Sequence, residues 1–256
     1  MLPHDLHVTR RRFMSAATGV VLAAAAAPHT HAQVGGTSPA RLSARPRPGV
    51  ARTLASGPLG LGKGSRDGVV QMPATLRDGP VPVLLFFHGA TQNGAAMLRR
   101  IGPAADAAGV VVVAPDSRDG TWDAIRGEFG EDVAFLNDVL VFVFARLPVD
   151  PARLVLGGFS DGASYALSLG LANGDLFPRV IAGSPGFIVQ APAQGHPRFF
   201  VSHGRSDQIL PIDRCSRVIV PRLQSMTYDV TYREFEGRHE LPPAIATEAL
   251  NWMMAG

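Results

Sequence analysis

Cysteine and lysine are almost absent from this chain of 256 residues. Cys215 is the single cysteine, so no disulfide bond can form within the chain, and a fold held together by disulfides is excluded. Lys63 is the single lysine, and the other basic side chains in the charge count are arginines. The fold must therefore depend on a hydrophobic core. The length and the 46% hydrophobic content suffice for one large α/β domain.

A strong excess of charge is missing too. The formal net charge is +3, but residues 10–12 are three arginines and the first 32 residues hold one acidic side chain, Asp5. The rest of the chain carries 21 basic and 20 acidic side chains, a net charge of about +1. This balance gives no reason to expect binding to nucleic acid or to a membrane surface.

Short motifs for metals and dinucleotides are absent as well. The sequence has no H-E-x-x-H, no C-x-x-C and no G-x-G-x-x-G. Residues 60–65 are rich in glycine, but they lack the spacing of a phosphate-binding loop and follow no apolar strand, so we expect a surface loop. The sequence therefore predicts chemistry that uses no metal and no cofactor.

The first 32 residues have the pattern of an export signal. Consecutive arginines in residues 9–14 precede an alanine-rich run over residues 16–27, which is too short to span a bilayer well and is followed by small residues. We predict a Tat-type signal peptide in residues 1–32, cleaved after Ala32. The mature protein would be periplasmic or extracellular, without stable membrane insertion. An uncleaved anchor, or a start codon placed upstream of a cytoplasmic enzyme, is the alternative.

Residues 33–50 contain mainly Gly, Ser, Pro and Arg and show no apolar periodicity, so we predict a disordered leader. The remaining residues, 51–256, form the predicted catalytic domain. In it, apolar runs typical of strands alternate with segments that have helical spacing, which predicts a mostly parallel central sheet with helices on both faces. The expected strands are 69–73, 81–87, 110–114, 153–159, 180–184, 198–202 and 228–235, and the expected helices are 95–108, 132–146, 161–171, 214–224 and 243–254.

Ser160 stands where an apolar strand changes abruptly into a helix. The sequence there is G-F-S-D-G, so the residues two positions before and after the serine, Gly158 and Gly162, have no side chain. A nucleophilic serine at the tip of a strained strand-to-helix turn requires such neighbours. The helix that follows directs its free N–H groups toward whatever the serine attacks. The motif therefore indicates a serine nucleophile.

A serine nucleophile needs a histidine to take its proton and a carboxylate to orient that histidine. Both should follow the serine in the chain, each after the carboxyl end of a strand. His239 follows the last expected strand, whereas His196 precedes its strand and His203 is expected to shape its loop. Asp207 leaves the strand before that of His239. The sequence thus predicts the triad of Ser160, Asp207 and His239.

Two backbone N–H groups are expected to complete the site. One belongs to Asp161, directly after the serine, and the other to Ala90, in the loop after the strand at residues 81–87. His88 in the same loop is expected to brace it by hydrogen bonding.

Trp122, Thr91 and Gln92 follow the carboxyl ends of strands and are candidates for lining a substrate pocket. For Trp122, packing in the core is the favoured role, and pocket lining is the alternative that its position after a strand allows.

Together these motifs resemble those of an α/β-hydrolase. The resemblance covers residues from about Val69 to the C-terminus and is strongest to the phospholipase/carboxylesterase branch and to the polyhydroxybutyrate-depolymerase-like or feruloyl-esterase-like branch. It implies hydrolysis of carboxylic esters through an acyl-enzyme on Ser160, with Asp207 and His239 in the roles given above. The motifs that carry it are F-F-H-G-A-T-Q at 86–92, G-F-S-D-G at 158–162, H-G-R-S-D at 203–207 and G-R-H at 237–239.

The segment between the strands at 180–184 and 198–202 is short, so we expect no cap domain and an open cleft for small or medium esters. A polyester depolymerase or feruloyl-type esterase stays open as a narrower reading, although no additional binding domain or disulfide framework supports polymer degradation. A serine peptidase of the prolyl-oligopeptidase type and a non-catalytic binding module are the remaining alternatives.

Overall fold

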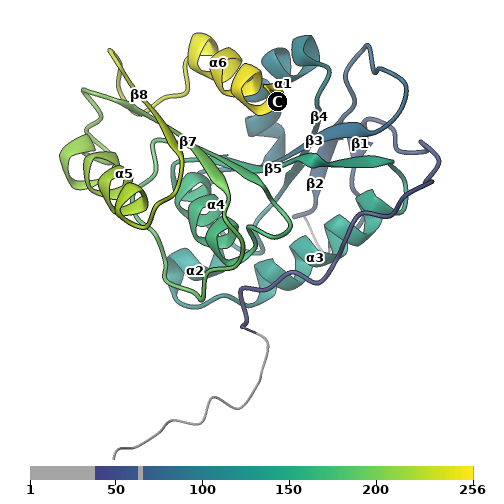
Figure 1. Ribbon diagram of the computed structural model, residues 1–256, viewed down its shortest axis with the longest axis horizontal. Coiled ribbons are helices and arrows are strands. Elements are labelled where there is room, and N and C mark those ends of the chain that lie inside the picture. The colour runs from purple at the N-terminus through teal and green to yellow at the C-terminus, as the bar shows by residue number, and fades with distance from the viewer. Residues whose placement is uncertain (1–37, 63–65, 256) are drawn as a thin grey trace, which may run out of the picture. The chain divides into compact units, whose positions relative to one another are not determined.

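The computed structural model describes residues 38–62 and 66–255 (Figure 1). The predicted signal peptide, residues 1–32, lies outside the described residues, as do residues 33–37 of the predicted leader and Lys63. Among the described residues, no helix combines the length and the hydropathy that a membrane crossing needs.

Eight strands of the described residues form one sheet with the order β1-β2-β4-β3-β5-β6-β7-β8. The pairs from β4 through β3 to β8 are parallel, and β1 and β2 are antiparallel to their neighbours. The mostly parallel sheet predicted from the sequence is thereby confirmed. The strands are β1 (Gly57–Pro58), β2 (Gly68–Gln71), β3 (Val81–Phe87), β4 (Val111–Pro115), β5 (Val149–Phe159), β6 (Arg179–Gly183), β7 (Arg198–Gly204) and β8 (Val230–Phe235).

Helices cover both faces of this sheet, and no helix lies between β6 and β7, so no cap domain is present there (Figure 1). On one face, α1 and α6 pack over one apolar cluster. On the other, α2, α3, α4 and α5 pack over a second, larger cluster. The helices are α1 (Gly94–Ala108), α2 (Asp123–Arg126), α3 (Glu131–Phe144), α4 (Asp161–Ala172), α5 (Ser216–Ser225) and α6 (Pro243–Met254), with a 3-10 turn at Ile212–Arg214.

Strand β3 shows why the sheet is buried on both sides. Val83, Leu85 and Phe87 point to the larger cluster, whereas Leu84 and Phe86 point to the cluster under α1 and α6. Successive side chains of a strand face opposite sides, so a central strand needs apolar residues at every position. The continuous apolar run in the sequence meets this requirement.

Short elements differ from the sequence expectations. The two-residue strand β1 is not among the predicted strands, and it pairs with the outer side of β2. Helix α2 is not among the predicted helices, because four residues are too few to show helical periodicity. Helix α5 begins at Ser216, two residues after the predicted start at Arg214, which lies in the preceding 3-10 turn.

The prediction of a disordered leader was wrong for residues 38–50. This segment runs beside α3 (Figure 1) and buries Ala40, Leu42 and Ala44 against the larger cluster. The backbone N–H of Leu42 donates to Oδ1 of Asn173 at 2.8 Å, and Nδ2 of Asn173 donates to the carbonyl of Ala40 at 2.8 Å. Every second residue from Ala40 to Ala44 is buried, as in an extended strand. Because two of these three residues are alanines, the composition of the segment did not indicate that it packs on the domain.

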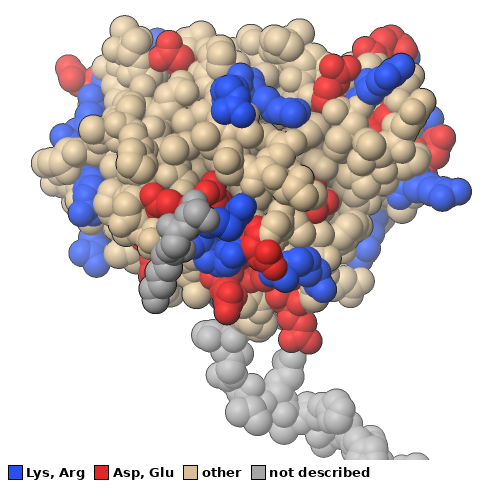
Figure 2. All heavy atoms as spheres, turned by 180° about the vertical axis from the view of Figure 1, so that it is seen from behind, with Lys and Arg blue, Asp and Glu red and all other residues tan. Residues whose placement is uncertain are grey.

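Charged side chains of both signs are mixed on the surface. Arg41 and Arg45 at the start of the described chain both pair with Asp175, at 2.7 and 2.8 Å. Figure 2 shows blue and red groups interspersed over the face that it displays. The absence of nucleic-acid binding remains a prediction from the charge balance.

The buried side chain of Asn173 is expected to anchor residues 38–50. Asn173→Ala removes its bonds to Leu42 and Ala40 and a third to the carbonyl of Leu169, so we expect a loss of about 2–3 kcal/mol in the free energy of unfolding. Urea unfolding measures it. As control, Asn251→Ala replaces an exposed asparagine on α6 and should change stability by less than about 0.5 kcal/mol. Equal losses in the two variants would contradict the anchoring role.

Candidate active site

Ser160 lies on the sharp turn between β5 and α4, in a strained backbone conformation. Its φ of 59° and ψ of −124° are sparsely populated by residues other than glycine. The sheet holds it there, because the N–H of Ser160 donates to the carbonyl of Gly183 in β6 at 2.9 Å. The surrounding structure thus compensates for the strain of the turn.

The two flanking glycines are required by close backbone contacts. A Cβ atom on Gly158 would lie 2.3 Å from the carbonyl oxygen of Gly162. A Cβ atom on Gly162 would lie 2.4 Å from the carbonyl oxygen of Phe87, at the end of β3. Neither position can hold a side chain unless the backbone moves, which is the steric reason for the G-x-S-x-G pattern.

The structure brings together the three residues that the sequence predicted as a triad. Oγ of Ser160 lies 2.8 Å from Nε2 of His239, and Nδ1 of His239 lies 2.6 Å from Oδ2 of Asp207. A carboxylate accepts only, so Nδ1 carries the proton and Nε2 is left to accept from the hydroxyl of Ser160. This arrangement can remove a proton from the serine as it attacks an electrophile.

The carboxylate of Asp207 is buried but fully hydrogen-bonded. Its Oδ1 accepts from the amides of Ile209 at 2.9 Å and Leu210 at 2.8 Å. Burial by itself would raise the pKa of Asp207, but the hydrogen bonds from His239 and from the two amides outweigh it and lower the pKa below its ordinary value. Asp207 is therefore ionised at neutral pH and can stabilise a positive charge on His239.

His203 braces the Asp207 turn. Its Nε2 donates to the carbonyl of Leu210 at 2.8 Å, so its Nδ1 accepts from the hydroxyl of Ser216 at 2.7 Å. Burial lowers the pKa of His203, which keeps the ring neutral in this role. His196, in contrast, hydrogen-bonds to the carbonyl of Thr227 near the amino end of β7, at the opposite edge of the sheet.

The two predicted N–H donors belong to segments that lie next to Ser160. A Cβ atom on Gly89 would lie 3.1 Å from Cβ of Ser160, so the turn that contains Ala90 lies against the serine. A hydrogen bond of 3.2 Å from the N–H of Gln92 to the carbonyl of Gly89 closes this turn. Within the described residues, the N–H groups of Ala90 and Asp161 meet no acceptor, so both are available to an oxygen atom bound at Ser160.

His88 braces the loop that contains Ala90 by hydrogen bonding, as the sequence predicted. Its Nδ1 donates to the carbonyl of Gly89 at 2.7 Å, and its Nε2 accepts from the amide of Ser117 at 2.9 Å. Burial lowers the pKa of His88, which favours this neutral form.

Trp122 packs in the core, so of its two predicted roles the structure supports packing and not pocket lining. It is fully buried, its Nε1 donates to the carbonyl of His88 at 2.9 Å, and it stacks on Tyr165. The indole fills the space beneath the loop and supports it from the core side. Its packing depends on α4 and β3, which are distant in the sequence.

Asp132 was not singled out as a site residue, although it organises the loop after β4. It is fully buried, with Oδ1 accepting from the amide of Arg118 and Oδ2 from that of Asp123, both at 2.6 Å. On the same loop, the hydroxyl of Thr121 donates to Oδ2 of Asp161 at 2.7 Å, which ties the loop to the start of α4. Burial raises the pKa of Asp132 to about 6, despite these hydrogen bonds.

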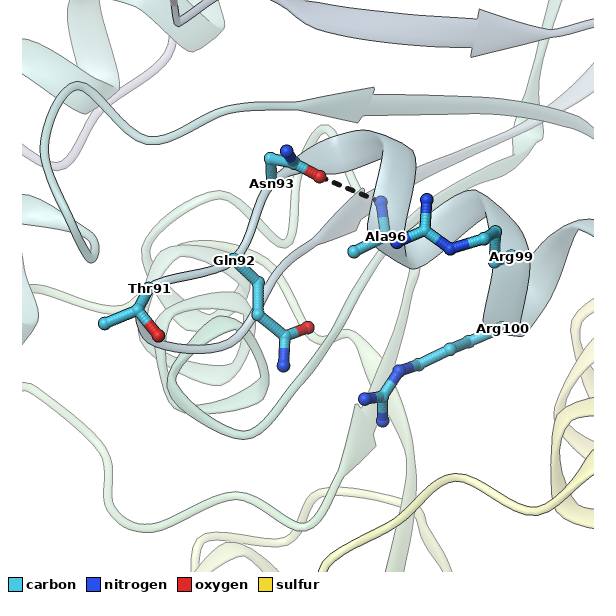
Figure 3. Close-up of a pocket in the computed structure, with 6 residues that line it drawn as sticks. All are labelled: Thr91, Gln92, Asn93, Ala96, Arg99 and Arg100. Atoms are coloured by element: carbon cyan, nitrogen blue, oxygen red, sulfur yellow. Dashed lines mark hydrogen bonds between the residues drawn. The ribbon is translucent and has the colours of Figure 1, made fainter.

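A cavity of about 420 Å³ adjoins the site (Figure 3). Thr91 and Gln92 line it, as do three residues of α1, Ala96, Arg99 and Arg100, and the helix cap Asn93. The sequence predicted the first two as pocket residues. The arginines carry no motif that could have identified them. Among residues 38–62 and 66–255, no cluster of three His, Cys, Asp or Glu side chains is placed to hold a metal ion.

Comparisons with known proteins show what this chain is similar to. No family model matches the chain. The chain is 30% identical over 105 residues to the probable feruloyl esterase C of Aspergillus oryzae. The matched residues make up 40% of this chain and 37% of that relative. The match thus spans well under half the length of the curated relative.

Solved structures resemble the chain over a greater length. A carboxylesterase of Bacillus cereus has a TM-score of 0.58 at 20% identity, covering 74% of this chain and 94% of its own. The acetyl xylan esterase of Aspergillus awamori has a TM-score of 0.61 at 12% identity, covering 78% and 99%. The chain has the α/β-hydrolase fold. The solved neighbours belong to the group of esterases that the sequence motifs indicated.

The raised pKa of Asp132 predicts a pH dependence of stability. Between about pH 4, where an exposed aspartate titrates, and about pH 6, the folded state holds a proton that the unfolded state has lost. The contribution of protonated Asp132 to the free energy of unfolding is therefore fully present below about pH 4 and is lost as the pH rises through about 6. In urea unfolding, the stability of the wild type relative to Asp132→Asn should fall over this interval. Parallel pH profiles for the two proteins would refute the burial effect.

Proposed function

We propose that the chain is a serine carboxylesterase that hydrolyses carboxylic esters through an acyl-enzyme on Ser160. The observation that carries this proposal is the continuous chain of hydrogen bonds from Ser160 through His239 to Asp207. The names of the relatives and neighbours, which are feruloyl, carboxyl and acetyl xylan esterases, support an ester as the substrate.

In the acylation step, Oγ of Ser160 attacks the ester carbonyl while Nε2 of His239 takes the hydroxyl proton. The negative charge that develops on the carbonyl oxygen receives hydrogen bonds from the amides of Ala90 and Asp161. His239 then transfers its proton to the alcohol oxygen as the carbon–oxygen bond breaks. Asp207 stabilises the positively charged imidazole between the two transfers.

Deacylation repeats the sequence with water. His239 takes a proton from a water molecule, whose oxygen attacks the acyl carbon bound to Ser160. Collapse of the intermediate releases the carboxylic acid, and the proton returns through His239 to Oγ of Ser160. Every proton transfer in this cycle uses Nε2 of His239, so no metal or cofactor is needed.

We further propose that the enzyme works in the periplasm or outside the cell. The arginine pattern and the alanine-rich run within residues 9–32 support export by the twin-arginine route.

Exposed apolar side chains near Asp207 support small or medium acyl groups as substrates. Phe187 and Ile209 are 45% and 70% exposed, on the loops that follow β6 and β7. The amide of Ile209 donates to Asp207, and the two loops meet where Gly186 approaches Leu210. Because Phe187 offers an aromatic face, a feruloyl-type aromatic acid is the narrower alternative for the acyl group.

Hydrolysis of p-nitrophenyl esters from acetate to dodecanoate tests the activity. We expect the wild type to prefer the short esters, and Ser160→Ala to lose turnover because it lacks the nucleophile. Asp207→Asn should lower kcat by about 10³- to 10⁴-fold, because an amide cannot hold the productive tautomer of His239. Labelling of the wild type, but not of Ser160→Ala, by a fluorophosphonate checks the nucleophile independently. If the wild type cleaves no ester and is not labelled, the proposed function is wrong.

The exposed apolar side chains of Phe187 and Ile209 should determine acyl preference. Phe187→Ala is expected to lower the ratio of kcat/KM for hexanoate to that for acetate by about fivefold to tenfold, because the longer chain loses an apolar contact. Val141→Ala, which removes an equally exposed apolar side chain from α3, should leave the ratio unchanged. An unchanged ratio in Phe187→Ala would place the acyl group elsewhere.

A further inference from the structure

The cavity lined by Gln92 and Arg100 is connected to the triad by two sets of contacts. One wall is the turn after β3, which lies against Ser160 through Gly89. On the opposite wall, the guanidinium of Arg100 lies 4.9 Å from the ring centroid of Phe159, and that ring lies 4.9 Å from the ring of His239. Arg100 and His239 thus both pack against the ring of Phe159.

This cavity carries positive charge without an internal counter-ion. Within the described residues, no carboxylate forms an ion pair with Arg99 or Arg100, and the single side-chain hydrogen bond of Arg99 goes to the carbonyl of Ala95 at 3.3 Å. Arg41 and Arg205, in contrast, are each paired with acidic side chains. The two guanidinium groups at the cavity are therefore available to an anionic ligand.

Side chains, and not the end of helix α1, would recognise such a ligand. The amide of Gly94 already donates to Oδ1 of Asp116 at 2.7 Å, and the amide of Ala96 donates to Oδ1 of Asn93 at 2.9 Å. Figure 3 shows the side-chain amide of Gln92 and the guanidinium of Arg100 directed toward the same space. Planar guanidinium groups bind carboxylates through two parallel hydrogen bonds, so a carboxylate suits this space best.

The position of the cavity assigns it to one part of the substrate. In the proposed mechanism, the alcohol oxygen must lie at Nε2 of His239 to receive its proton. Arg100 packs against Phe159, the same ring that His239 contacts, which connects the cavity to the histidine that protonates the alcohol. The exposed apolar residues Phe187 and Ile209 lie on other loops, where they suit the acyl part. A volume of about 420 Å³ falls within the range of sites for small molecules.

We propose that Arg100 and Arg99, with Gln92, form a subsite for a carboxylate on the alcohol part of the ester, so that the preferred substrates are esters of hydroxycarboxylic acids. This inference rests on the proposed function, because it presumes that Ser160 and His239 cleave the ester. The reaction adds one water and releases two acids: the acyl group as a carboxylic acid, and the alcohol part as a hydroxy acid.

A pair of substrates that differ in charge tests the subsite. The esters 3-acetoxybenzoate and 3-acetoxybenzamide have the same acyl group and alcohols of similar shape, but only the first carries a carboxylate. We expect the wild type to hydrolyse the acid with the higher kcat/KM, and Arg100→Gln to lower the ratio of acid to amide by about fivefold. Arg99→Gln should lower it less, and Arg100→Lys should retain part of the preference because it keeps the charge.

Arg77→Gln is the matched control. Arg77 is exposed and precedes β3, so it lies at the amino edge of the sheet, opposite the edge that carries Ser160. Its replacement by glutamine removes the same charge as Arg100→Gln. This variant should leave kcat/KM for both esters unchanged. Added salt should lower the acid-to-amide ratio of the wild type, because exposed charges are screened.

The outcomes separate the two proposals. If the wild type cleaves both esters and Arg100→Gln leaves their ratio unchanged, the subsite is wrong and the esterase function stands. If Arg77→Gln lowers the ratio as much as Arg100→Gln does, the preference reflects overall charge, and the subsite is again wrong. If the wild type cleaves neither ester, the esterase function fails.

Discussion

The site depends on the close approach of three backbone segments beneath Ser160. The end of β5, the start of α4 and the end of β3 meet at distances that leave no room for a side chain on Gly158 or Gly162. This contact forces the positive φ of Ser160 and projects its hydroxyl from the carboxyl edge of the sheet. The parallel strands on either side make the strain tolerable, because their hydrogen bonds hold the turn in place. The backbone conformation of Ser160 therefore depends on how β3, β5 and α4 pack together.

Two histidines near Asp207 show how burial separates similar groups into different roles. His203 is fully enclosed, and both of its ring nitrogens are used, by Leu210 and by Ser216, so it holds the loop in a neutral form. His239 hydrogen-bonds to Asp207 through Nδ1 but remains partly exposed, with Nε2 directed at Ser160. The low-dielectric surroundings of Asp207 strengthen its hydrogen bond to His239, and its hydrogen bonds keep the carboxylate charged.

The loops at the carboxyl edge of the sheet differ in their chemistry. Those after β6 and β7 expose the apolar side chains of Phe187 and Ile209, whereas the first two turns of α1 carry Arg99 and Arg100. In the proposed reaction, an ester also has two different parts, which meet at the carbonyl group that Ser160 attacks. We infer that apolar contact selects the acyl part and charge selects the alcohol part.

The sequence by itself determined the parallel sheet and the turn at Ser160, because continuous apolar runs and paired glycines reflect constraints that act within a few residues. It also predicted His239 and Asp207, since the order of strands places their loops at one edge. Tertiary structure alone decided between the two predicted roles of Trp122, packed Leu42 and its neighbours onto the domain, and brought Arg100 and His239 against the same ring. These outcomes depend on contacts between residues far apart in the chain. The composition of a local segment does not specify the surface against which that segment packs.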